Sequence, residues 1–170
     1  METIHKRLSE SQRIFFNNIY NCTDKEMYFY GSIMRPDYIP EKSDIDVDIF
    51  TDNMSSTIHK LCQLLDIEKT NFRSFILKID NKIVHGFKTR YLNKEVNINT
   101  ELSLYDEQYK SLVLHDHSSL FVLPLHITIV LCIVKFLYYY VGCISNQMYR
   151  RIKRFLMNAN DEVSFVVLDS

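Results

Sequence analysis

Two segments near the N-terminus hold residues whose types and spacing fit metal-assisted phosphate chemistry. The first is the pair Gly31 and Ser32, and the second is the run at residues 44–50, in which three aspartates alternate with apolar residues. A β-strand would place those aspartates on one face and the apolar residues on the other. Neighbouring carboxylates repel one another unless a cation neutralises them, and Mg²⁺ prefers oxygen ligands. The two segments together predict a site for a metal and a nucleotide.

The rise of a β-strand decides which aspartates can share one ion. Residues two apart lie about 7 Å from each other at Cα, within reach of a common metal. Asp44 and Asp48 lie about twice as far apart. Asp44 and Asp46 are therefore the predicted metal ligands, with Mg²⁺ as the expected ion and Mn²⁺ as a substitute. The alternative is a solvated edge strand that binds no metal.

Gly31 is one of only three glycines, and it stands between an apolar run and a serine. A glycine at such a place indicates positive φ or a close approach of the backbone to another group. We expect backbone amides around Gly31, and the hydroxyl of Ser32, to donate to the phosphates of a nucleotide. The alternative for Ser32 is a helix N-cap.

The order of these residues resembles a known family. Its signature is an apolar residue, Gly and Ser, then a spacer, then Ser-Asp-apolar-Asp-apolar, and here it covers residues 30–32 and 43–47. The chain thus resembles the nucleotidyltransferase superfamily, which includes DNA polymerase beta, poly(A) polymerases, CCA-adding enzymes and minimal nucleotidyltransferases. The resemblance implies Mg²⁺-dependent transfer of a nucleoside monophosphate from an NTP, such as ATP, to an acceptor hydroxyl, with release of pyrophosphate. It makes Asp44 and Asp46 catalytic and Ser43 part of the nucleotide site.

The resemblance also implies a third acidic residue on a later strand. In the strand expected at residues 95–100, the best-fitting position is Asn97. An amide ligates weakly and accepts no proton near neutral pH. Three accounts stay open: Glu95 or Glu101 replaces Asn97, Asp48 contributes, or the protein binds nucleotide without efficient transfer. The last account describes a regulatory or subunit protein on the same fold, and it is the alternative to an enzyme.

Three further groups of residues each have two interpretations. Lys135 lies in an apolar segment where members of the poly(A) polymerase branch carry a lysine that meets the triphosphate; the alternative is a snorkelling side chain. The tyrosines at residues 138–140 could stack on a base or fill the core. The histidines at positions 115 and 117 would need a third ligand to hold a metal.

Basic residues raise the same kind of question. Lys88 and Arg90 share a strand face, where they would meet phosphate or acceptor, or else lie on a solvated edge. Four basic residues between positions 150 and 154 would contact RNA, DNA or an acidic partner, or else form a solvated helix face.

Periodicity indicates the elements that position these residues. Helical spacing predicts helices over residues 3–20 and 55–65, and strands are expected at residues 27–30, 45–50, 75–79, 83–91 and 95–100. After residue 101 we expect helices at 102–114, 124–141 and 146–158, and a short strand at 163–168. The pattern predicts an α+β fold, in which a mixed β-sheet palm (residues 1–101) flanked by helices precedes a helical subdomain (residues 102–170).

Length and composition bound the remaining expectations. A chain of 170 residues that is 46% hydrophobic can bury one substantial core, so we expect one domain over residues 1–170. The net charge of −1 excludes a global basic field for bulk nucleic-acid binding. Scattered cysteines and the lack of a signal peptide favour a cytoplasmic or nuclear protein. The expected partners are an NTP, an RNA, DNA or protein acceptor, and a protein subunit or a second copy.

The segment at residues 120–143 is long and apolar enough to raise the question of a membrane span. A charged lysine within it is costly in a bilayer and ordinary in a buried helix. We therefore expect a core helix that starts near Pro124, and no membrane.

Overall fold

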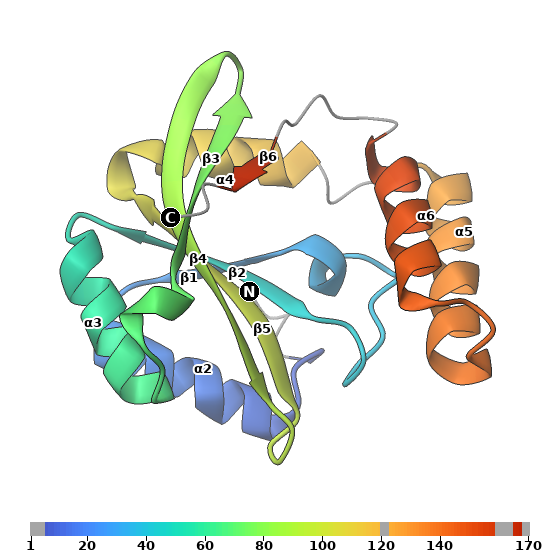
Figure 1. The fold of residues 1–170 in the computed structure, drawn as a ribbon, viewed down its shortest axis with the longest axis horizontal. Coiled ribbons are helices and arrows are strands. Elements are labelled where there is room, and N and C mark those ends of the chain that lie inside the picture. The colour runs from blue at the N-terminus through green and yellow to red at the C-terminus, as the bar shows by residue number, and fades with distance from the viewer. Residues whose placement is uncertain (1–5, 120–122, 159–164, 168–170) are drawn as a thin grey trace.

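The fold is built on one mixed β-sheet. The computed structural model describes residues 6–119, 123–158 and 165–167, and its six strands lie in the order β1-β2-β5-β4-β3-β6 (Figure 1). The strands are β1 (Met27–Tyr30), β2 (Ile45–Thr51), β3 (Arg73–Ile79), β4 (Lys82–Asn93), β5 (Ile98–Asp106) and β6 (Phe165–Val167). The helices are α2 (Glu10–Thr23), α3 (Met54–Leu65), α4 (Lys110–Ser119), α5 (Leu125–Phe136) and α6 (Asn146–Asn158). The predicted α+β class is confirmed.

One face of the sheet is covered by α2 and α3. These helices contribute Phe16, Ile19, Ile58 and Leu61 to a core whose sheet side comes from alternate residues of β2 and β5. Alternation along a strand sends the intervening residues to the opposite face. The aspartates of β2 therefore lie on the face that α2 and α3 leave uncovered.

The second face is only partly covered. A smaller core joins Val113 of α4 to Phe50, Phe75 and Tyr105 of the sheet. Since Phe50 lies at the far end of β2 from Asp46, α4 covers that end, and no helix of the described residues covers the beginning of β2 on this face. On the other side of this opening, α5 and α6 lie side by side (Figure 1).

The first helix starts later than its apolar stripe predicted. It begins at Glu10, because Ser9 forms a capping box with Gln12: each side chain accepts from the backbone N–H of the other residue. Of the predicted helical residues before Glu10, those at positions 3–5 lie outside the described residues. Residues 6–8 precede the cap and are not helical.

The predicted helix at residues 102–114 is wrong for its first five positions. There β5 continues to Asp106, paired in parallel with β2 from Ile45↔Thr100 to Thr51↔Asp106. Leu102 and Leu104 are fully buried against α2 and α3. Burial on both sides of the strand outweighed the helical propensity of this leucine-rich segment.

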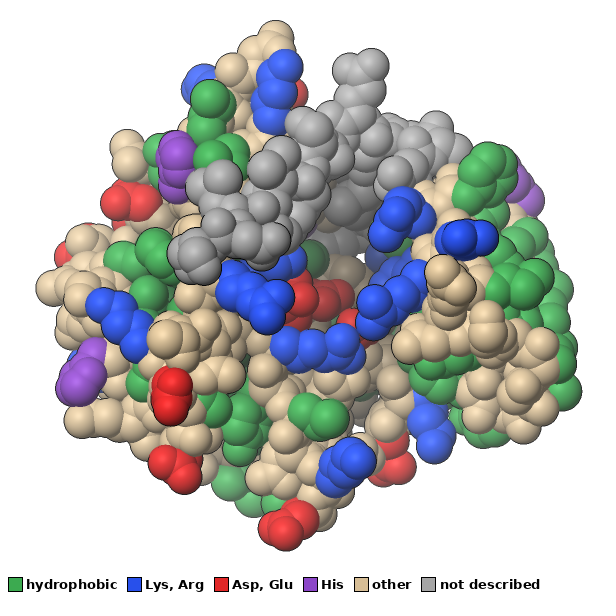
Figure 2. Space-filling view, in the orientation of Figure 1, with side chains coloured by type: hydrophobic (Ala, Val, Ile, Leu, Met, Phe, Trp, Pro, Cys, Tyr) green, Lys and Arg blue, Asp and Glu red, His purple; other side chains and the backbone are tan. Residues whose placement is uncertain are grey.

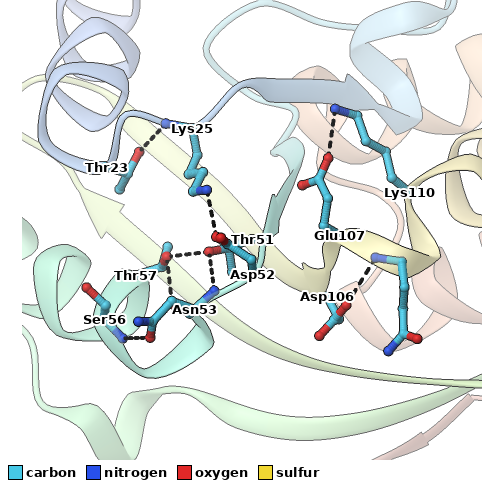
Figure 3. Close-up of polar contacts among 11 residues, drawn as sticks. Thr23, Lys25, Thr51, Asp52, Asn53, Ser56, Thr57, Asp106, Glu107 and Lys110 are labelled. Carbon is cyan, nitrogen blue, oxygen red and sulfur yellow. Dashed lines mark hydrogen bonds and ion pairs between the residues drawn. The ribbon is translucent and has the colours of Figure 1, made fainter.

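The turn from β2 into α3 is fixed by short polar side chains (Figure 3). Asn53 caps α3 by accepting from the N–H of Ser56, and its own N–H donates to the hydroxyl of Thr51. The hydroxyls of Thr51 and Thr57 lie 2.9 Å apart. This anchor holds the end of β2 and so the register of its aspartates.

The apolar segment near the C-terminus forms a short helix followed by a π-helical turn. In α5 the side chains of Ile127, Leu131 and Val134 are buried, whereas Leu125 and Ile133 are exposed. Leu137–Val141 completes the segment as one π turn, and Tyr138 stacks on Tyr149 of α6 at 4.4 Å between ring centroids. No helix within the described part of the chain is long and apolar enough to cross a membrane.

Candidate active site

The backbone at Gly31 touches a catalytic candidate directly. Gly31 follows the last residue of β1 with φ +70° and opens a short 3₁₀ helix, Gly31–Met34. A Cβ at this position would lie 2.2 Å from Oδ2 of Asp46. The prediction of positive φ or close approach is confirmed, and both apply. Only glycine allows this turn to sit against the carboxylate of Asp46.

Ser32 places a hydroxyl in the same turn. Its side chain is buried, and its Oγ has no hydrogen-bond partner among the described residues. The 3₁₀ helix has no side-chain cap, so Ser32 does not act as an N-cap. A buried hydroxyl without a partner costs about 1–3 kcal/mol. A ligand that bonded to it would remove that cost.

The two predicted metal ligands lie at the start of β2: Asp44 directly precedes the strand, and Asp46 is its second residue. Both Asp44 and Asp46 are half-buried, next to the open part of the sheet face. Burial, and then the nearby charge of Asp44, raise the pKa of Asp46 to about 7, although the ammonium of Lys153 acts in the opposite direction. A carboxyl with such a raised pKa is destabilised as an anion, and a cation would relieve that destabilisation.

The third aspartate of the run at residues 44–50 has a different partner. Asp48 is fully buried, and its Oδ2 lies 2.7 Å from Nδ1 of His117 in α4. The imidazole also stacks on Tyr30, with 4.1 Å between the ring centroids. Burial raises the pKa of Asp48 to about 6, and the contact with His117 limits the rise. Burial alone would lower the pKa of His117, but Asp48 outweighs it and raises that pKa.

Sequence reasoning missed this pair. It considered His117 only as a weak metal ligand in a loop, whereas the structure places it on α4, near the carboxylate of Asp48. No local pattern connects the two residues, because the contact arises only when α4 packs over the sheet.

The predicted third position lies outside the strand. Asn97 is in the turn before β5, with φ +54°, and its carbonyl accepts from the side-chain amide of Gln12. Glu95 lies in the same turn. Within β5 the residue paired with Asp46 is Glu101, and side chains paired across parallel strands point to the same face. The structure therefore brings Glu101 next to Asp46, and neither Glu95 nor Asn97 shares that register.

Lys135 and Ser43 meet in a buried polar cluster beside the aspartates. The ammonium of Lys135 donates to the carbonyl of Asp37 at 2.8 Å, lies 2.8 Å from its carboxylate, and reaches Oγ of Ser43 at 3.4 Å. Arg35 binds the same carboxylate through Nε at 2.8 Å. Burial lowers the pKa of Lys135 despite the pull of Asp37 in the other direction. Lys135 thus fixes the segment that leads into Asp44.

The strand register arranges the site in rows across the sheet. The first row, from β1 through β2 and β5 to β4, is Tyr30, Asp46, Glu101 and Arg90. The next row is Tyr28, Asp48, Ser103 and Lys88. Figure 2 shows acidic side chains in a hollow between the sheet and the pair α5–α6, with Lys and Arg side chains on both sides. Acidic side chains in the hollow, with basic side chains on both sides of it, suit a metal-bound polyphosphate.

The donor set fits Mg²⁺. The carboxylates of Asp44 and Asp46, the second with a strongly raised pKa, lie at the start of β2, and Ser32 directly follows the glycine that approaches Asp46; all of these side-chain donors are oxygens. Over residues 6–119, 123–158 and 165–167, no three His, Cys, Asp or Glu side chains form a complete metal site. An ion held by Asp44 and Asp46 would therefore complete its shell with water and substrate oxygens, as Mg²⁺ ordinarily does.

Comparison with known proteins gives one family. The sequence profile of the nucleotidyltransferase domain matches residues 12–134. No curated protein matches the chain at a significant level. A chain in the solved structure of the GLD-2/RNP-8 complex is 13% identical, over 91% of this chain and 62% of that one, with a TM-score of 0.33. This protein thus spans less than two thirds of that chain, and the TM-score is too low to compare the two in detail.

Proposed function

The chain belongs to the nucleotidyltransferase domain family, and from that premise we propose that it transfers a nucleoside monophosphate from an NTP to an acceptor hydroxyl, releasing pyrophosphate. The observation that carries the proposal is the contact of the Gly31 turn with Asp46. It joins a phosphate-sized backbone turn to a carboxylate that is poorly stable as an anion. A nucleotide with its divalent cation would satisfy both.

The phosphates would lie against the turn. Backbone N–H groups around Gly31 and the unpaired hydroxyl of Ser32 would donate to phosphate oxygens. Asp44 and Asp46 would hold Mg²⁺, or Mn²⁺ in its place. When bound, the ion would offset negative charge on the phosphates and lower the pKa of an oxygen that it binds.

Glu101 is the proposed third carboxylate. It lies next to Asp46 in the parallel register, and it contributes to the raised pKa of that residue. A carboxylate there can accept the proton of the attacking hydroxyl as the new bond to the α-phosphorus forms and the bond to pyrophosphate breaks. The alternative, a regulatory or subunit protein on the same fold, is motivated by the amide at position 97 and by the helical, partly basic C-terminal half of the chain. The position of Glu101 beside Asp46 supports the enzyme.

Lys135 and Ser43 would act indirectly. Because the Lys135 ammonium is already bonded to Asp37, we propose that it positions the Ser43–Asp44 segment. Its charge would still be felt by the triphosphate, since the cluster holds two cations, Lys135 and Arg35, for one carboxylate.

The test is pyrophosphate release from each of the four NTPs with Mg²⁺ or Mn²⁺, alongside incorporation of label into candidate acceptors. D44N and D46N should each lower release at least about 100-fold, because each removes a charged metal ligand. D52N is the matched control. Asp52 directly follows β2, is exposed and pairs with Lys25. Release that persists in a D44N/D46N double variant would refute the proposal.

A further inference from the structure

A cavity lies beside the proposed active site, on the side away from Gly31. It measures about 390 Å³ and is lined by Thr70, Asn71, Arg73, Lys88, Thr89, Arg90 and Glu101. We name it the β4 cavity. It lies where β3 begins opposite Lys88, so that within the described part of the chain no strand pairs with the β3 side of β4 beyond that point. We propose that the β4 cavity binds phosphate groups of a single-stranded nucleic acid whose terminal hydroxyl is the acceptor. The proposal rests on the proposed function.

The charge of the cavity favours an anion. Three cationic side chains, Arg73, Lys88 and Arg90, face one carboxylate, that of Glu101. The Lys88 ammonium lies 3.7 Å from the Glu101 carboxylate, so part of the charge is already offset. The two arginines supply the remaining charge, and arginine is well suited to bind phosphate oxygens in pairs.

Arg90 is held in place within the cavity. Its Nε and one terminal nitrogen donate to Oδ1 of Asn99, at 3.3 and 3.1 Å. A guanidinium that is already oriented loses less conformational entropy when it binds a ligand. The side-chain amide of Asn71 adds a further donor at the edge of the cavity, whereas the hydroxyl of Thr70 already donates to Glu68. A phosphodiester would therefore meet a prepared set of donors.

The position of the cavity fits the direction of attack. In the row across the sheet, Asp46 and Glu101 separate the Gly31 turn on one side from Arg90 on the other. Adjacent strands are about 4.8 Å apart, so about 10 Å separates β2 from β4. In phosphoryl transfer the attacking oxygen approaches opposite the leaving group. With the pyrophosphate at the Gly31 turn, the acceptor would come from β4.

Further basic side chains lie on α6, on the opposite side of the hollow. Lys153 of α6 is near enough to Asp46 to oppose the rise in its pKa. Arg150, Arg151 and Arg154 occupy the same helix and are exposed. A small neutral acceptor would gain little from cations on both sides of the hollow in Figure 2. A single-stranded nucleic acid, with one negative charge per nucleotide, would contact the cations on both sides.

The experiment compares two variants of the full chain that lose equal charge. R73Q/R90Q removes the arginines of the β4 cavity. K78Q/K82Q removes two exposed lysines of the β3–β4 hairpin that do not line it. Binding of labelled oligonucleotides of about 16 nucleotides, as RNA and as DNA, is followed by fluorescence anisotropy between about 50 and 200 mM salt.

R73Q/R90Q should weaken oligonucleotide binding about tenfold or more, and should make the salt slope of log K less steep by about 1.4. K78Q/K82Q should stay within about twofold of the wild type, because its lysines make no contact in the cavity. R73Q alone, which leaves the Arg90–Asn99 contact intact, should give an intermediate loss if the fold is unaffected. Comparing the affinities for the RNA and the DNA oligonucleotides shows which of the two nucleic acids the β4 cavity binds.

Binding of Mg-NTP is measured in parallel, to separate this proposal from the proposed function. Retained NTP binding with lost oligonucleotide binding in R73Q/R90Q supports the β4 cavity as the acceptor site. Equal oligonucleotide affinity and salt slope in all variants would overturn it and leave the proposed function standing. A wild-type protein that binds NTP but no oligonucleotide at low salt, and instead binds an acidic protein, would also overturn it.

Discussion

Oδ2 of Asp46 occupies the space where a side chain on Gly31 would begin, with 2.2 Å between that oxygen and an ideal Cβ. The turn and the carboxylate are thus parts of one packed unit. Gly142 offers a natural comparison, because its φ of +71° is nearly the same and a Cβ there would meet nothing within 4 Å. The two glycines separate the effect of backbone strain from the effect of close approach.

G31A should abolish nucleotide binding and should destabilise the fold more than G142A does. Both substitutions place a Cβ at positive φ, which costs about 1–2 kcal/mol. Only G31A also displaces the Asp46 carboxylate. Urea unfolding and Mg-NTP titration of the two variants provide the measurement. Equal losses of stability, with nucleotide binding intact in G31A, would show that the contact has no functional role.

E101Q should lower the turnover rate about 10²- to 10⁴-fold, because the amide cannot accept the proton of the acceptor hydroxyl. E95Q and N97G should retain activity, since both residues lie in the exposed turn before β5. Glycine at position 97 also tolerates the positive φ of Asn97. Steady-state pyrophosphate release measures all three. An active E101Q beside an inactive N97G would restore Asn97 as the third catalytic position.

The stability of the metal-free protein should fall as the pH rises through the raised pKa of Asp46. With a pKa of about 7 when folded and an ordinary value of 3.8, Asp46 binds more proton in the folded state. Its contribution is therefore complete below about pH 4 and lost by about pH 7. D46N should match the wild type near pH 4 and should exceed it at pH 8, by on the order of 2–4 kcal/mol.

Urea unfolding in EDTA measures this difference, and Mg²⁺ provides the complementary test. Added Mg²⁺ should stabilise the wild type at pH 8, where the Asp46 carboxylate is ionised, and should stabilise D46N less. D52N is the control. The pKa of Asp52 is lowered in the folded protein, so its contribution to stability changes with pH in the direction opposite to that of Asp46. A wild-type protein as stable as D46N at pH 8 without metal would contradict the destabilised carboxylate.

K135M should destabilise the protein by about 3–5 kcal/mol, because it leaves the Asp37 carboxylate buried with one partner fewer. K25M is a matched comparison at the surface. The distance of the Lys25–Asp52 pair (Figure 3) is 2.9 Å, close to the 2.8 Å of Lys135–Asp37, but Asp52 is exposed. K25M should therefore destabilise the protein much less than K135M does. Similar costs for the two variants would mean that burial does not set the strength of these pairs.

The strand alternation at residues 44–50 predicted the acidic face of β2, because period-two patterning is a local property. The role of Glu101 could not be predicted in the same way. It depends on the register of β5 beside β2, which long-range packing sets. The segment after residue 101 contains several good helix formers, and only the burial of Leu102 and Leu104 explains why it continues as a strand.

The buried partners of the site were also beyond local patterns. Lys135 was predicted as a triphosphate ligand or a snorkelling side chain, but the cluster with Asp37 and Ser43 joins segments distant in sequence. The same is true of Asp48 and His117. Patterns identify which face of an element is polar, and packing decides which polar groups meet.

The contact of Lys135 with Asp37 ties α5 to the loop that precedes β2. Both residues are almost fully buried, so separating the helices from the sheet at this point would expose an ion pair and leave its charges apart. We expect α5 and the sheet, which lie on the two sides of the hollow, to move together there as one rigid body. Substrates would then enter and leave past the basic side chains at the edge of the hollow, without a movement of α5 relative to the sheet.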